Sequence, residues 1–191
     1  MASTRVAGAT GAMIALLIAP FCFAQVSRDG LRLAAVLDSM DVEKHWIAGA
    51  HVQWRSGEPD GKAVSDEGVH SHCSSFVAAA GDRLGVYLLR PPEHSQTFLA
   101  NAQSDWLDEE GPGRGWTPID SFDGAQKAAN AGMLVVAVYR TKSDRSAGHI
   151  AIVRPSEKRA DQVSDEGPEI IQAGQENYAS TSLRNGFRHR P

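Results

Sequence analysis

The stretch "GVHSHCSSFVAAAGDRLG", residues 68–85, combines a cysteine preceded by two histidines with an apolar run of helical period. Apolar side chains recur every three or four residues from Cys73 onward, as they do on one face of an α-helix. Glycine typically ends a helix, so Gly85 predicts that the helix stops at about Leu84. The inward-facing stripe of this helix consists of Cys73, Phe76, Val77, Ala80 and Leu84.

The first helical turn is a special place for a thiol. Unpaired N–H groups and the positive end of the helix dipole favour an anion there, which lowers the pKa of a cysteine. Four interpretations of Cys73 are open: a zinc ligand beside His70 and His72, half of a disulfide, a packed core residue, or a nucleophile. One cysteine with two closely spaced histidines does not match the usual zinc-ligand spacing, so we expect the histidines to line a cleft and no metal to bind.

The first 24 residues have the layout of a secretory signal peptide. A short, positively charged start precedes an apolar run from Gly11 to Ala24 that ends in Cys-Phe-Ala, which predicts cleavage after Ala24. The run is shorter than the roughly 20 residues of a membrane span, so we expect no stable membrane insertion after its removal. Cleavage removes Cys22 and leaves Cys73 as the only cysteine, which excludes an internal disulfide. We predict a periplasmic or secreted protein in which residues 25–191 form one domain.

The overall composition is that of an ordinary globular domain. The 191 residues are 42% hydrophobic and 22% charged, and the formal net charge is −4. Lysine and arginine are scattered along the chain rather than clustered. This pattern argues against nucleic acid or acidic lipid as a main partner.

Helical patterns come first along the chain. Besides the helix that begins at Cys73, we predict a helix that Ser95 caps and Gly111 ends, with Pro91 and Pro92 leading into it. The two other predicted helices are residues 29–40 and 123–131.

Strand patterns follow the helices. Three short, apolar, β-branched runs are bounded by Gly, Pro or charged residues, and the tail "TSLRNGFRHRP" adds a last short strand. The order of helices and then antiparallel strands predicts an α+β domain with helices packed on one side of the sheet. The three runs are "GMLVVAVYR", "GHIAIVRP" and "PEIIQAG".

Two polar residues occur where these predicted strands are apolar. His149 begins the run "HIAIV" and could face Cys73, where it would act as a base. Gln172 lies within "IIQAG", and a buried amide there needs a partner. The far nitrogen of His149 is a natural one, because a base must be held in one tautomer. Alternatively Gln172 lies on an exposed face, and Asn177, just past the strand, is the second candidate.

The order of "HCSSFV", "GHIAIV" and "IIQAG" resembles that of the CHAP and NlpC-type cell-wall hydrolases, which are papain-like cysteine peptidases and amidases. The resemblance covers roughly residues 54–178. It implies a papain-like fold in which Cys73 attacks an amide of peptidoglycan, His149 is the base and Gln172 orients it. The family has histidine, glutamate or asparagine in the third place, so glutamine departs from the pattern. No metal or organic cofactor is implied.

The functional prediction is therefore an exported thiol hydrolase that cleaves peptidoglycan through an acyl-enzyme on Cys73. The backbone N–H of Cys73 is the first candidate for binding the oxyanion, and the side chains of Gln53 and His72 are further candidates. Two alternatives remain open from the sequence. One is a non-catalytic cell-wall or peptide-binding module in which Cys73 only packs, and the other is a transferase that passes the same acyl group to an amine.

Overall fold

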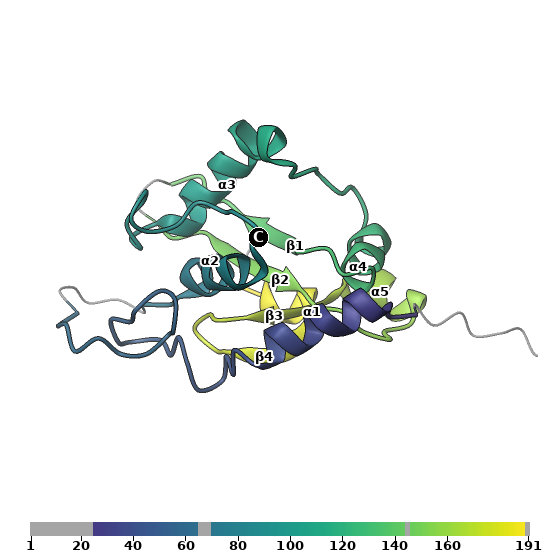
Figure 1. Ribbon diagram of the computed structural model, residues 1–191, viewed down its shortest axis with the longest axis horizontal. Coiled ribbons are helices and arrows are strands. Elements are labelled where there is room, and N and C mark those ends of the chain that lie inside the picture. Colours follow the sequence, from purple (N-terminus) through teal and green to yellow (C-terminus); the bar gives the residue numbers. More distant parts are fainter. Residues whose placement is uncertain (1–24, 65–69, 144–145, 190–191) are drawn as a thin grey trace, which may run out of the picture.

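Four antiparallel strands form the centre of the computed structural model, which describes residues 25–64, 70–143 and 146–189 (Figure 1). Each strand pairs with the next one along the chain, and Tyr139 lies opposite His149 in the first pair. The strands are β1 (Val135–Tyr139), β2 (His149–Val153), β3 (Glu169–Gln172) and β4 (Tyr178–Ser182). The predicted signal peptide, residues 1–24, lies outside the described residues.

Helices cover both faces of this sheet. Alternate side chains of β2 point to opposite faces, with Ile150 and Ile152 in one buried cluster and Ala151 and Val153 in another. The first cluster packs against α2 (Cys73–Leu84) and α3 (Leu99–Glu109), and the second against α4 (Phe122–Asn130) and α6 (Leu183–Gly186). The prediction of helices on one side only is therefore wrong. A continuous apolar run such as "IAIV" is buried on both faces and needs cover on both.

The α+β class is confirmed, and several predicted elements match the structure closely. The helix that begins at Cys73 ends at Leu84, and Gly85 adopts the left-handed conformation with φ 70°. The helix predicted at 29–40 is α1 (Arg28–Asp38), whose first turn is capped by the side chain of Ser27. None of the helices in the described part of the chain has the length and apolar composition needed to cross a membrane.

The predicted cap at Ser95 is wrong, because α3 begins only at Leu99, after Phe98 in a left-handed conformation with φ 53°. The segment before it is held as a loop by Gln96. The side-chain oxygen of Gln96 accepts a hydrogen bond from Ser75 at 2.7 Å, and its amide nitrogen donates to the carbonyl of Val52 at 3.0 Å. A tertiary contact therefore decides where this helix starts.

Four short elements differ from the predicted pattern. A 3-10 helix, η1 (Gly111–Arg114), follows α3, and α5 (Ala160–Glu166) buries only Val163, too little to give a periodic signal. The last strand, β4, lies earlier than the predicted tail strand. Ser182 then caps α6 by accepting a hydrogen bond from the N–H of Asn185 at 3.2 Å, which turns the chain into a helix.

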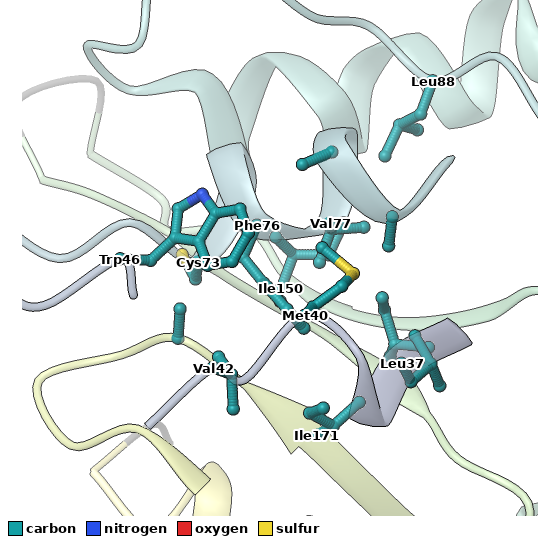
Figure 2. Packing of buried hydrophobic residues seen from close by; sticks show 14 of the residues in the cluster. Leu37, Met40, Val42, Trp46, Cys73, Phe76, Val77, Leu88, Ile150 and Ile171 are labelled. Carbon is teal, nitrogen blue, oxygen red and sulfur yellow. The ribbon is translucent and has the colours of Figure 1, made fainter. Parts of the chain in front are cut away.

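The larger buried cluster joins α1 to the sheet beneath the N-terminal half of α2. Figure 2 shows side chains from α1, α2, β2, β3 and the loop after α1 meeting in this cluster. Trp46 and Phe76 pack edge to face with ring centroids 5.3 Å apart, and both are fully buried. Cys73 belongs to the same cluster, so its position is fixed by core packing.

Two leucines of α1 offer a matched test of this packing. Leu37 is fully buried, whereas Leu31 is 61% exposed. Leu37→Ala should lower the free energy of unfolding by about 2–5 kcal/mol, since it removes core contacts and leaves a cavity. Leu31→Ala should change it by less than about 0.5 kcal/mol. Urea unfolding followed by circular dichroism measures both, and similar losses in the two variants would contradict the packing described.

Candidate active site

The helix α2 presents Cys73 as its first residue. His72 is the N-cap residue, and its side chain accepts no hydrogen bond from the N–H groups of the first turn. Cys73 is only 4% exposed, because the residues one turn further along, Phe76 and Val77, anchor this face of the helix in the core. The sequence prediction that the thiol faces inward at the positive end of the helix agrees with this placement.

The strand β2 presents His149 as its first residue, and a close-packed loop leads into it. A Cβ at Gly148 would lie 2.5 Å from Oδ1 of Asn101 and 2.6 Å from the carbonyl oxygen of Tyr139, so only glycine fits there. The side chain of Asn101, on α3, also donates to the carbonyl of Ser146 at 2.9 Å. The approach to His149 is therefore fixed by both α3 and β1.

The thiol of Cys73 and the ring of His149 are hydrogen-bonded to each other. Burial of Cys73 raises the pKa of its thiol. The hydrogen bond and positive charge of His149, together with the backbone N–H groups of Ile150 and Ser74, lower the pKa and outweigh burial. The pKa of Cys73 therefore lies below its ordinary value, which favours the thiolate, the nucleophilic form of cysteine.

Gln172 holds the other side of the His149 ring. Its side-chain oxygen lies 2.9 Å from Nε2 of His149, while its amide nitrogen donates to the carbonyl of Glu176 at 3.2 Å. The bond to Glu176 fixes which end of the amide faces the ring, so Nε2 of His149 must carry the proton and donate it. This leaves Nδ1 for Cys73. Gln172 is 4% exposed, and the exposed alternative for its side chain is excluded.

Asn177 serves a different part of the structure. Its amide nitrogen donates to the carbonyls of Val42 and His45 at 2.7 and 2.9 Å, and its oxygen accepts from the N–H of Gly174 at 3.0 Å. These bonds tie the β3–β4 loop to the loop that follows α1. The geometry therefore brings Gln172, and not Asn177, to His149.

The two side chains considered for the oxyanion differ in their surroundings. Nε2 of His72 donates to the carbonyl of Ala50 at 2.8 Å, so this nitrogen is already engaged. Burial lowers the pKa of His72, which favours its neutral form. Gln53 is exposed in the loop before α2. The described residues contain no group of three or more His, Cys, Asp or Glu side chains arranged to hold a metal ion.

Three contacts around the site were not predicted from the sequence. The N–H groups of Ser74 and Ile150 reach the sulfur of Cys73, and the ring of Phe187 packs edge-on against His149 with centroids 4.7 Å apart. The two backbone donors directly follow the predicted site residues Cys73 and His149. They could have been predicted from the positions at which the helix and the strand begin. No sequence motif marks Phe187.

Comparisons with known proteins give no relative from which the role of this site could be inferred. No protein-family model matches the chain, and the search of curated proteins gives no match either. The functional argument therefore depends on the connected side chains of Cys73, His149 and Gln172.

The lowered pKa of Cys73 predicts how its alkylation by iodoacetamide depends on pH. The midpoint in the native protein should fall below the roughly 8.5 of a free thiol. In His149→Ala, the main opposing influence is lost while burial remains, so the midpoint should rise above the native one. His94→Ala is a control, because the His94 ring bonds to the carbonyl of Ser95. An unchanged midpoint in His149→Ala would show that the pair does not set the thiol's reactivity.

Gln172 and Asn177 should respond differently to truncation. Gln172→Ala removes the acceptor that holds His149, so the alkylation midpoint of Cys73 should rise. Asn177→Ala breaks bonds between two loops, so it should lower the free energy of unfolding by about 1–3 kcal/mol and leave the midpoint near the native value. Alkylation profiles and urea unfolding of both variants test this difference. A raised midpoint in Asn177→Ala together with a native midpoint in Gln172→Ala would refute it.

Proposed function

We propose that this protein is a papain-like thiol hydrolase that cleaves an amide bond of peptidoglycan. The observation that carries the proposal is that His149 bonds to Cys73 and to Gln172 at once. A nucleophile, a base and a group that orients the base form the arrangement on which acyl transfer by a thiol depends. The three side chains come from α2, β2 and β3, in the order that the family resemblance implies.

The first half of the proposed reaction forms an acyl-enzyme. The Cys73 thiolate attacks the amide carbon, and the carbonyl oxygen takes the negative charge of a tetrahedral intermediate. The N–H groups in the first turn of α2 are suited to stabilise this oxyanion, since the helix dipole points its positive end there. The C–N bond then breaks, and protonated His149 gives its Nδ1 proton to the leaving amine.

The second half releases the acid. His149, now neutral, removes a proton from water, and the resulting hydroxide equivalent attacks the thioester carbon. Collapse of the second tetrahedral intermediate breaks the C–S bond, releases the carboxylic acid and restores the Cys73 thiolate beside the protonated His149. Nε2 of His149 donates to Gln172 throughout, so the ring keeps the orientation in which Nδ1 alone moves protons.

Glutamine in the orienting position has a chemical consequence. A neutral amide fixes the tautomer of His149 without adding negative charge, so it stabilises the imidazolium less than a carboxylate would. The thiolate of Cys73 then depends more on the N–H groups of Ser74 and Ile150. We infer a thiolate–imidazolium pair in which His149 is the main stabilising group and the two backbone N–H groups add smaller contributions.

The proposed substrate rests on two features of the sequence. The resemblance to CHAP and NlpC-type enzymes favours peptidoglycan stem-peptide or amide bonds. The predicted signal peptide, residues 1–24, fits a substrate that lies outside the cytoplasmic membrane. The fold supports the proposal only at the level of α+β architecture.

The direct test incubates the mature protein with purified peptidoglycan and analyses the soluble products by mass spectrometry. The native protein should release fragments, and Cys73→Ala, which removes only the sulfur, should release none while keeping the native circular dichroism spectrum. Equal release by the variant would refute the thiol mechanism.

Two further outcomes identify the alternative activities. Binding of native protein and Cys73→Ala to sedimented peptidoglycan, with no fragments from either, would indicate a binding module. Fragments that carry an added amine when glycine amide is present in excess would indicate a transferase, because the same acyl-enzyme then passes to an amine instead of water.

A further inference from the structure

The turn formed by residues 183–188, which we call the α6 turn, packs directly against the candidate site. A Cβ at Gly186 would lie 2.6 Å from the side-chain oxygen of Gln172 and 2.5 Å from Cδ1 of Ile170. Real Cβ atoms do not approach other atoms so closely. Gly186 is also outside the left-handed region of backbone conformation. A side chain at this position would therefore force Gln172, Ile170 or the turn to shift, for reasons of space and not of backbone geometry.

The atom nearest to Gly186 on Gln172 is the one that holds His149. The same side-chain oxygen accepts the hydrogen bond from Nε2 of His149 at 2.9 Å. A side chain at position 186 would have to displace this oxygen or move the whole turn. A displacement of about 1 Å is enough to take the bond beyond hydrogen-bonding distance.

Two other residues of the α6 turn reach the same network. The ring of Phe187 packs against the ring of His149 at an angle of 62°. Arg188 donates to the carboxylate of Glu176 at 3.0 Å, and the backbone carbonyl of Glu176 in turn accepts from the amide nitrogen of Gln172. The turn thus touches the imidazole, the amide and the residue that fixes the amide.

We propose that the α6 turn is a positioning element of the site and that Gly186 is a positioning residue, which acts on His149 through Gln172. The inference rests on the proposed function, because it assigns the turn to the machinery of a Cys73–His149 pair. The absence of a side chain at 186 lets the turn press against the amide while leaving its oxygen in reach of His149. Phe187 packs edge-on against the His149 ring.

Gly186→Ala is the central test, with two readouts on the mature protein. The alkylation midpoint of Cys73 should move upward by about one pH unit, because a mispositioned imidazole no longer stabilises the thiolate. The kcat for peptidoglycan fragment release should fall at least about tenfold with KM little changed, since a base is misaligned and substrate contacts remain. Circular dichroism establishes that the variant is folded.

Gly113→Ala is the matched control. Gly113 is exposed in η1, has nothing within 4 Å of an added Cβ and is outside the left-handed region. The same substitution there should leave the alkylation profile and kcat unchanged. A folded Gly186→Ala that behaves like Gly113→Ala would overturn the proposal and make the α6 turn merely structural.

Phe187→Leu decides the matter if Gly186→Ala does not fold. Leucine keeps the apolar packing of the turn but removes the aromatic edge from His149, so the alkylation midpoint should again move upward. A native profile in this variant would refute the proposal. Alkylation of Cys73 needs no peptidoglycan, so it tests the positioning inference independently of fragment release. If the native protein releases no fragments, the proposed function is overturned, and the alkylation profiles still test the role of the α6 turn.

Discussion

The imidazole of His149 connects the whole candidate site, because each of its ring nitrogens has a different partner. Nε2 donates to Gln172 on β3, and Nδ1 is left for Cys73 on α2. These two hydrogen bonds of His149 require that β2 lie beside β3. They also require that the first turn of α2 lie next to the start of β2. The sheet order, the packing of α2 and the tight loop at Gly148 all meet this requirement.

Burial works both for and against this arrangement. Cys73, His149 and Gln172 are each 4% exposed, and burial alone would keep a thiol neutral. Hydrogen bonds are stronger in the same low-dielectric surroundings, so the imidazole and two backbone N–H groups outweigh the effect of burial. The lowered pKa of the thiol therefore depends on the positions of these donors.

Much of this site could be predicted from local sequence. Helical period and Gly85 gave the extent of α2, and short apolar runs gave β1, β2 and β3. A contact between His149 and Gln172 could be expected, because both are polar residues in buried strands and consecutive strands commonly pair.

Other features depend on tertiary contacts that a single sequence does not reveal. The start of α3 is set by Gln96, which bonds to distant parts of the chain. The contact of Gly186 with Gln172 depends on how the α6 turn folds back, and the bonds of Asn177 depend on a loop far away in sequence. Cover on both faces of the sheet could have been expected from "IAIV", since a run without alternation indicates a strand buried on both sides.

The bonds of Asn177 bear on how the protein opens. They join the β3–β4 loop to a carbonyl 135 positions earlier in the chain, so closing this contact restricts a long segment. A surface loop ordinarily fluctuates by itself, at the low-stability end of a protein. Here an opening of the loop must also release the segment after α1, and it disturbs the carbonyl of Glu176 that orients Gln172. Amide exchange in this loop should accordingly follow the cooperative unfolding of the sheet and α1, not local fraying.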